Sequence, residues 1–231
     1  MKLLIIRPQP GADATAQRAA ALGIATLVIP LFEVRPVAWT VPASQAYDAL
    51  MITSANALLH GGAELVLLQN LPVLAVGAAT AAYAKAAGFS VAATGEGGAA
   101  QLIETAAARG YAKILWLTGA DHIALDPPAS VKVDSIPVYG AEALPPPHAL
   151  AAALHRPVIT ALYSPRAACL FSQICGDLGI DKSRQSLAAL SPAIAKAAGS
   201  GWRFIAVAER PADAALLAAA LSAFTKADSD P

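Results

Sequence analysis

The sequence predicts an α/β protein with two related domains, each with a parallel sheet flanked by helices. Short continuous apolar runs alternate with alanine-rich stretches of helical length, which is typical of parallel strands that crossover helices bury on both faces. Segments in the first half of the chain also have counterparts in the second half. The 231 residues are 56% hydrophobic, which is ample for a core in each of two domains of ordinary size.

Ten short apolar runs are the expected strands, and helices are expected after most of them. In chain order these runs are residues 2–6, 25–29, 49–52, 73–76, 90–93, 113–117, 131–136, 158–163, 186–190 and 204–207. The first run ends at Arg7 and is too short to be the apolar core of a signal peptide. The longest apolar stretch, residues 214–224, is shorter than the roughly 18 residues of a membrane span and predicts a buried helix.

An internal repeat indicates that the two domains are related. The matching segments are 48–57 with 158–167, and 71–80 with 185–194. An alanine- and lysine-containing helix is expected after each segment of the second pair, 71–80 and 185–194. One of these helices is expected to end at Gly88 and the other at Gly199 or Gly201, because glycine is favoured after the last turn of a helix.

A second correspondence predicts how the domains are threaded. Residues 3–7 resemble residues 114–118, and residues 29–33 resemble residues 136–140. The stretches 3–33 and 114–140 would then each supply the first βαβ unit of one domain. The first domain is then discontinuous. The predicted boundaries are residues 1–33 with 144–231 for domain 1 and residues 37–138 for domain 2, with crossings near 31–36 and 137–147.

Prolines concentrate at both predicted crossings. Pro30, Pro36 and Pro42 lie at the first, and Pro137 and residues 145–147 lie at the second. Two crossings side by side predict a two-stranded hinge. The alternative is that each proline only ends a strand, which explains the residues singly but not their concentration.

The charge balance and the cysteines exclude several classes of function. The 16 basic and 16 acidic residues cancel, and no lysine or arginine run could follow a phosphate backbone, so nucleic acid is not an expected partner. The two cysteines, Cys169 and Cys175, form no CxxC motif, and no His/Cys cluster has metal spacing. We expect buried free thiols, a reducing cytoplasm and no metal site.

No phosphate-binding or hydrolase motif is present. The sequence lacks a P-loop, a GxSxG elbow, an HExxH pair and a GxGxxG that opens a helix after a strand. A transferase or isomerase that uses a nucleotide is therefore an alternative without motif support.

Four repeat positions place small polar residues where strands lead into helices. They are Thr53-Ser54, Gly77 to Thr80, Ser164-Pro165 and Ser191-Pro192. Ligands of open parallel sheets bind outside the carboxyl ends of the strands, where helix N-termini offer N–H groups to anions. The set predicts two rims for an anionic ligand. The alternative is that Ser54, Thr80, Ser164 and Ser191 are only helix N-caps.

These segments resemble the recurring motifs of uroporphyrinogen-III synthases. The resembling segments are residues 53–57, 76–80 with 88–89, 136–139 and 163–168, and Arg7-Pro8 also fits. They come in the family's order and spacing and cover nearly the whole chain. Each motif is weak by itself, so the resemblance rests on their joint order.

The resemblance implies a lyase that cyclises hydroxymethylbilane and inverts its terminal pyrrole ring. The linear tetrapyrrole is expected in the cleft between the domains, and the reaction needs no cofactor and no metal. The terminal hydroxyl leaves to form an azafulvene, and the ring closes through a spiro intermediate. We expect a cytoplasmic protein without membrane partners, and the composition favours a monomer.

Tyr139 matches the family's tyrosine near the hinge and is the expected proton donor, because a phenol can donate a hydrogen bond at neutral pH. Its alternative role is packing at the second crossing. Arg7 is expected to face a substrate carboxylate or, alternatively, only to cap the first strand. His60, His122, His148 and His155 are expected to be solvated. The expected substrate-binding residues are Arg7, Ser54, Asn56, Gly77, Thr80, Ser164, Pro165, Ser191 and Ile194.

The chain departs from the family after residue 117. The family usually has an arginine beside Gly119 and another soon after, whereas this chain has Thr118 and then Ala120-Asp121-His122. The short segment that follows contains Pro127-Pro128, which predicts a missing or broken helix. The alternative function is a non-enzymatic bilobal protein that binds a small anionic ligand, although the lack of an export signal argues against its usual periplasmic setting.

Overall fold

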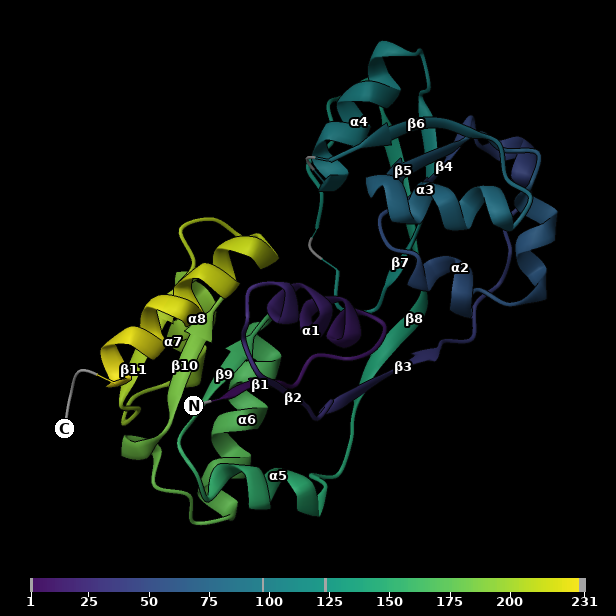
Figure 1. Ribbon diagram of the computed structural model, residues 1–231. Coiled ribbons are helices and arrows are strands. Elements are labelled where there is room, and N and C mark those ends of the chain that lie inside the picture. The colour runs from purple at the N-terminus through teal and green to yellow at the C-terminus, as the bar shows by residue number, and fades with distance from the viewer. Residues whose placement is uncertain (1, 97, 123, 229–231) are drawn as a thin grey trace. The chain divides into compact units, whose positions relative to one another are not determined.

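The computed structural model describes residues 2–96, 98–122 and 124–228, and Figure 1 labels its helices and strands. The chain divides into two compact units: unit 1 is Met1–Glu33 with Ala143–Pro231, and unit 2 is Val34–Glu142. The sheets are dominated by parallel pairs and flanked by helices, so the predicted α/β class is confirmed. The predicted boundaries of independently folding domains, and the hinge, stay predictions.

Unit 1 has a five-stranded sheet in the order β11-β10-β9-β1-β2, whose neighbouring strands pair in parallel. Its strands are β1 (Lys2–Ile5), β2 (Thr26–Val28), β9 (Val158–Leu162), β10 (Ser186–Ala189) and β11 (Phe204–Val207). Its helices are α1 (Gly11–Ala21), α5 (His148–Leu154), α6 (Pro165–Asp177), the 3₁₀ turn η3 (Lys182–Arg184), α7 (Pro192–Ala198) and α8 (Asp213–Asp228).

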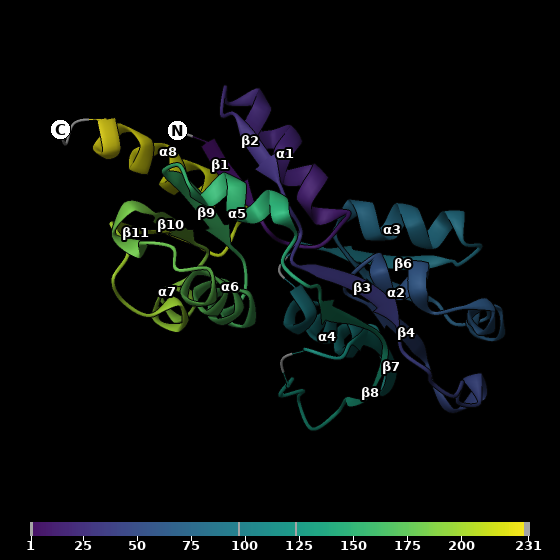
Figure 2. The ribbon, with the colours of Figure 1, turned by 90° about the horizontal axis from the view of Figure 1, so that it is seen from below.

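Helices cover both faces of this sheet. Leu3 and Ile5 pack in one cluster with residues of α1 and α8. Because side chains alternate along a strand, the buried Leu4 points to the other face, and Figure 2 shows α6 and α7 on that side. The buried helix predicted at residues 214–224 lies within α8. In the described part of the chain, no helix is long and apolar enough to cross a membrane.

Unit 2 has a six-stranded sheet in the order β3-β8-β7-β4-β5-β6. Its strands are β3 (Phe32–Pro36), β4 (Ala49–Ile52), β5 (Val73–Val76), β6 (Val91–Gly95), β7 (Lys113–Gly119) and β8 (Lys132–Ala143). Its helices are η1 (Ser44–Ala46), α2 (Asn56–His60), η2 (Ala63–Leu68), α3 (Gly77–Ala86) and α4 (Gly98–Ala108). Residues of α2 and α3 share one core cluster with the sheet, and residues of α4 share the other.

The two sheets have the same strand order once the predicted repeat is applied. Strands β2-β1-β9-β10-β11 of unit 1 correspond to β8-β7-β4-β5-β6 of unit 2. The first two strands of unit 1 therefore correspond to the last two of unit 2. Unit 2 has one further strand, β3, beside β8.

The connection between β7 and β8 lacks a counterpart of α1. Of the residues between these strands that the structure describes, 120–122 and 124–131, none is helical. This agrees with the missing or broken helix predicted from Pro127-Pro128.

All ten expected strands form, but β3 lies outside the predicted set. Its segment carries Glu33, Arg35 and Pro36, which are exposed, so it has no apolar run to mark it. Proline is tolerated at the end of an edge strand because the edge needs no further donor. The backbone N–H of Val37 donates to the carbonyl of Val138 at 3.0 Å, next to the β3–β8 pair.

The predicted glycine helix ends are confirmed. Gly88 follows α3 with φ of 86°, and its N–H donates to the carbonyl of Lys85 at 3.0 Å. Gly199 follows α7 with φ of 74°, and its N–H donates to the carbonyl of Lys196 at 3.1 Å. Both conformations favour glycine because a Cβ atom is strained at positive φ.

Both cysteines are free and lie in α6, but only one is buried. Burial raises the pKa of the Cys175 thiol to about 11. Cys169 is exposed, so the prediction that it is buried was wrong. The two positions lie six residues apart, which puts them on different sides of a helix.

Candidate functional site

The predicted site residues lie at or near the carboxyl edges of the two sheets. In unit 1, Arg7 follows β1, while Ser164 and Ser191 follow β9 and β10 and precede α6 and α7. In unit 2, Ser54 follows β4 and Gly77 follows β5. Tyr139 lies in β8 and pairs with Gly119, the last residue of β7. Since the strands that these residues follow or belong to pair in parallel within each sheet, these residues gather at one edge of it.

A cavity of about 520 Å³ lies at the carboxyl edge of unit 2. It brings together two predicted site residues, Ser54 and Tyr139, and it does not include Asn56, Gly77 or Thr80. Its lining residues come from the ends of β4, β7 and β8, the start of α4 and the segment after β7. They include Thr53, Ser54, Trp116, Gly119, His122 and Tyr139.

A register shift in the β7–β8 pair sets the position of Tyr139. Thr118 pairs with Pro137 and Gly119 pairs with Tyr139, so Val138 is left without a partner in this ladder. Such a bulge re-aims the side chain that follows it. The N–H of Ala120 donates to the carbonyl of Tyr139 at 2.8 Å and fixes the backbone there.

The Tyr139 ring lies directly against Gly119. A Cβ atom built at Gly119 would be 2.9 Å from Cε2 and Cζ of the ring and 3.2 Å from the hydroxyl oxygen. Any larger residue at this position would therefore push the ring away. Glycine at the end of β7 is part of how the fold places the phenol in the cavity.

Two aromatic rings form another part of the cavity wall. The indole Nε1–H of Trp116 donates to the hydroxyl of Thr53 at 3.2 Å. The ring of His122 stands edge-on to Trp116, with ring centroids 5.1 Å apart, and its Nδ1 lies 2.9 Å from the carbonyl oxygen of Gly119. His122 is exposed, as expected, but the sequence analysis missed its place in the site. Its position three residues after the end of β7 is the signal that could have found it.

The alternative role of Thr80 as an N-cap was wrong. Thr80 is the fourth residue of α3 and is buried, whereas the N-cap position belongs to Val76 and has no side-chain hydrogen bond. Ser54 is also not the N-cap of α2, which is Ala55, although its hydroxyl accepts a bond from the N–H of Asn56 at 3.2 Å.

In unit 1 the serines are true N-caps. The hydroxyl of Ser164 accepts from the N–H of Ala167 at 3.1 Å, and that of Ser191 accepts from the N–H of Ile194 at 3.4 Å. Pro165 and Pro192 occupy the first helical positions and have no N–H. Ile194 is buried, so a contact through its side chain finds no support, and its N–H already has a partner.

Arg7 belongs to a polar cluster at the carboxyl edge of unit 1. Its Nη1 lies 3.8 Å from Oδ1 of Asp213 and 3.4 Å from the hydroxyl of Thr15, and its guanidinium lies over the ring of Tyr163, 4.1 Å from the centroid. A Cβ atom at Gly11 would lie 2.7 Å from Arg7 Nε, so the first turn of α1 also confines the side chain. Arg7 therefore faces a carboxylate of its own chain. Neither the predicted contact with a substrate carboxylate nor the predicted capping of the first strand describes this arrangement fully.

Asp213 is the centre of this cluster. It accepts hydrogen bonds from Tyr163, from Thr15 at 3.0 Å and from Arg18 at 2.5 Å. Burial acts to raise the pKa of this carboxyl, but the bonds from Tyr163, Arg18 and Thr15 outweigh it and lower the pKa. Burial, followed by the bond to Asp213, raises the pKa of Tyr163 to about 12. The cluster stabilises a carboxylate beside a neutral phenol.

No metal-binding cluster is found among the residues that the structure describes: no three His, Cys, Asp or Glu side chains come close enough to hold an ion.

Comparison with known proteins gives one family. The family model described as HEM4, uroporphyrinogen-III synthase HemD, matches residues 13–218. A search of curated protein sequences finds no match.

Two solved structures resemble the chain over nearly its whole length. Uroporphyrinogen-III synthetase from Helicobacter pylori has a TM-score of 0.62 and 18% identity, over 96% of this chain and 99% of that chain. A mutant uroporphyrinogen III synthase from the extremely thermophilic bacterium Thermus thermophilus has a TM-score of 0.45 and 16% identity, over 100% of both chains. Because the Helicobacter pylori protein is only 18% identical, its similarity to this chain shows the fold alone.

Proposed function

The chain belongs to the uroporphyrinogen-III synthase family, whose enzymes act in haem biosynthesis, and we propose the steps and residues by which it cyclises hydroxymethylbilane. The family match over residues 13–218 is the observation that carries the function. The substrate is a small tetrapyrrole. Neither the family model nor the solved structures favour the alternative of a non-enzymatic binding protein.

We propose that Tyr139 donates the proton that lets the terminal hydroxyl of hydroxymethylbilane leave as water, with cleavage of the C–O bond. The proton that the pyrrole ring loses when the macrocycle closes would then restore the phenol. The arrangement that supports this role is the Tyr139 ring in the cavity of unit 2, held between the bulge of β8 and Gly119. A positioned acid contributes about 10²–10⁴-fold to a rate.

The carboxyl edge of unit 1 is proposed to bind acetate and propionate groups of the substrate. Arg7 supplies positive charge there, and its side chain is 31% exposed, so a second carboxylate can approach it from outside. Ser164, Pro165 and Ser191 shape the starts of the neighbouring helices, whose dipoles favour anions. In unit 2, Ser54 lines the cavity, whereas Asn56 and the backbone of Gly77 would contribute outside it.

Several finer points of the function are proposals as well. The enzyme is proposed to be a cyclising lyase that works as a cytoplasmic monomer, without a cofactor, metal or nucleic acid. The expectation that the substrate lies between the two units comes from the family resemblance.

The test supplies the purified chain with freshly generated hydroxymethylbilane and no added cofactor, and then separates the oxidised porphyrin isomers. We expect isomer III to predominate. Isomer I alone, which forms spontaneously, from protein shown to be folded by circular dichroism would overturn the proposed function.

A further inference from the structure

A cavity of unit 1 lies away from the edge that carries Arg7, Ser164 and Ser191. Its volume is about 980 Å³, at the upper end of the roughly 300–1,000 Å³ typical of small-molecule sites. Its lining residues come from the start of β1, from β2 and the residues beside it, from α5 and from the start of β9. They are Lys2, Ala25, Leu27, Val28, Ile29, Ala149, Ala152, Ala153, Arg156, Pro157 and Val158.

Two elements leave this space open for different reasons. Strand β2 is the outer strand of its sheet, and Leu27, Val28 and Ile29 are only half-buried, whereas β1 and β9 are buried almost throughout. Helix α5 turns Leu150 and Leu154 into the core. Its cavity side consists of Ala149, Ala152 and Ala153, whose side chains are too short to cover the strand.

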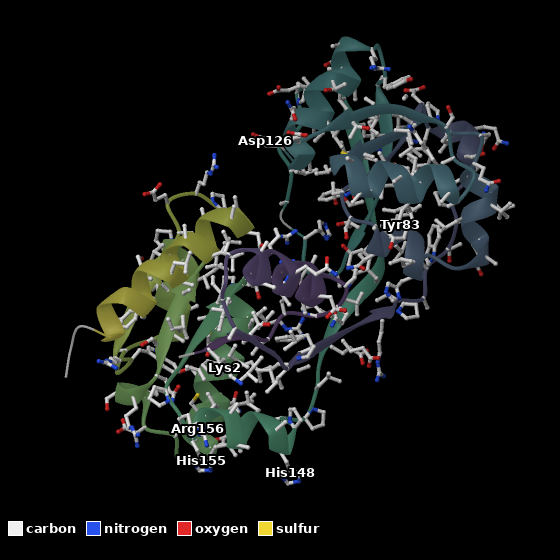
Figure 3. All side chains as sticks on the ribbon, in the orientation of Figure 1. Lys2, Tyr83, Asp126, His148, His155 and Arg156 are labelled. Atoms are coloured by element: carbon white, nitrogen blue, oxygen red, sulfur yellow. The ribbon has the colours of Figure 1, made fainter. Side chains whose placement is uncertain are left out.

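The cavity carries positive charge at one end. Lys2 pairs with Val158 in the β1–β9 ladder, and Arg156 lies two residues before Val158, so both cations belong to the amino edge of the sheet. Arg156 also continues the series of Ala149, Ala152 and Ala153 at helical spacing. Both side chains are exposed, and they are labelled in Figure 3.

No acidic residue is among those that line the cavity, and in the described part of the chain neither cation forms an ion pair with a carboxylate. An uncharged apolar ligand would not use these cations, and a cationic ligand would be repelled by them. An elongated molecule with an apolar chain and one anionic head matches both parts of the lining. Residues 25–29 span about 13 Å at the rise of an extended strand, which sets the length available to the chain.

We propose that this cavity binds a medium-chain carboxylate, with its acyl chain along β2 and α5 and its carboxylate at Lys2 and Arg156. The site is independent of the proposed function, because it lies at the amino edge of unit 1 and shares no residue with the carboxyl-edge sites. Its failure would leave the cyclisation reaction untouched.

Calorimetry with the full chain tests the site with three ligands of equal chain length, below their micelle concentrations. Decanoate is expected to bind saturably at one molecule per chain, and decanol and decyltrimethylammonium are expected to bind at least about tenfold more weakly. Equal affinity for decanoate and decyltrimethylammonium would overturn the proposal, and so would no binding of decanoate.

Variants test each part of the cavity. The double change Lys2→Gln/Arg156→Gln is expected to raise the Kd for decanoate by about fivefold, because two exposed charge pairs are lost. The matched control Lys85→Gln/Arg109→Gln removes two exposed cations of unit 2 and is expected to change nothing. Ala152→Phe fills the cavity and should abolish binding, whereas Ala152→Ser should preserve it.

Amide chemical shifts of the wild-type chain keep the test decisive if a variant fails to fold. Decanoate is expected to shift the amides of Leu27, Val28 and Ala152. Shifts confined to the carboxyl edges would contradict the site. Sedimentation with phosphatidylglycerol vesicles separates a free carboxylate from a lipid surface: we expect no co-sedimentation, and vesicle binding without decanoate binding would overturn the proposal.

Discussion

The two sheets share a strand order, but their carboxyl edges differ in whether a helix and a charged cluster cover them. We call the covered edge of unit 1 the closed edge and the edge of unit 2 that carries the cavity the open edge. In unit 1, α1 contributes Thr15 and Arg18 to Asp213, and the cluster around this carboxylate joins β1, β9 and α8. In unit 2, the segment that corresponds to α1 forms no helix among its described residues, and a cavity of about 520 Å³ lies beside it. The cavity of unit 2 therefore lies beside a segment without a described helix, whereas α1 of unit 1 helps to build a charged, pre-organised rim.

Under the proposed function, this difference separates the binding of the substrate from the chemistry. The phenol of Tyr139 lies in the open edge, and the arginine Arg7 lies in the closed one. Substitutions at one edge at a time separate the contributions of the two edges.

Tyr139→Phe should lower the turnover number of isomer III formation by about 100-fold, because a positioned proton donor is lost from the open edge. The melting temperature should stay within a few degrees of the wild type. Initial rates at saturating substrate measure the effect, and an unchanged rate would remove this tyrosine from the mechanism.

Gly119→Ala should lower turnover by about tenfold, since a misplacement of about 1 Å can cost up to 100-fold. The added methyl would meet the Tyr139 ring at 2.9 Å and displace it. In a Tyr139→Phe background the same change should have little further effect, because both act through one hydroxyl. Full additivity of the two changes would contradict this reasoning.

Asp213→Asn should lower the free energy of unfolding by about 1–3 kcal/mol at neutral pH, because the charged centre of the closed edge is lost. The native pKa of Asp213 lies below its usual value, so its contribution is present above about pH 4 and is lost as the pH falls through the native pKa. Urea unfolding from pH 7 to pH 3 measures the difference between the two proteins, which should shrink with acid.

The exposed Asp126, labelled in Figure 3, supplies the matched control. Asp126→Asn should follow the wild type at every pH. An acid response of Asp126→Asn like that of Asp213→Asn would show that the effect does not come from the cluster.

Tyr163→Phe should cost about 1 kcal/mol at neutral pH through its lost hydrogen bond. The pKa of Tyr163 is raised to about 12, so its stabilising effect is complete below pH 10 and disappears as the pH rises towards 12. Alkaline unfolding curves of this variant and the wild type should therefore converge. The exposed Tyr83 gives the control, because Tyr83→Phe should show no convergence.

The apolar runs and the internal repeat predicted the fold well, because parallel strands buried on both faces need such runs. Strand β3 has no such apolar run, because it is an edge strand and its Glu33 and Arg35 are exposed. Its edge position is defined only by the assembled sheet. The repeat also predicted that the two sheets are related, which a single segment could not.

The sequence predicted where the candidate residues lie in the fold better than it predicted their contacts. Parallel strands bring Ser54, Ser164 and Ser191 to carboxyl edges whatever the loops contain, and the cap roles of the latter two followed from Ser-Pro at a helix start. The Arg7–Asp213 pair joins residues about two hundred positions apart, so no local pattern could find it. Thr80 was misjudged because α3 begins at Gly77, four residues earlier than a cap at Thr80 would require.

The division of labour between the two edges is tested most directly by the kinetics of isomer III formation in Tyr139→Phe and Arg7→Gln, measured side by side. The expected result is a fall in kcat with little change in KM for Tyr139→Phe, and a rise in KM of about fivefold with little change in kcat for Arg7→Gln, since uniform binding alone is lost there. The reverse pattern, or equal losses of kcat in both variants, would contradict the separation of chemistry from binding.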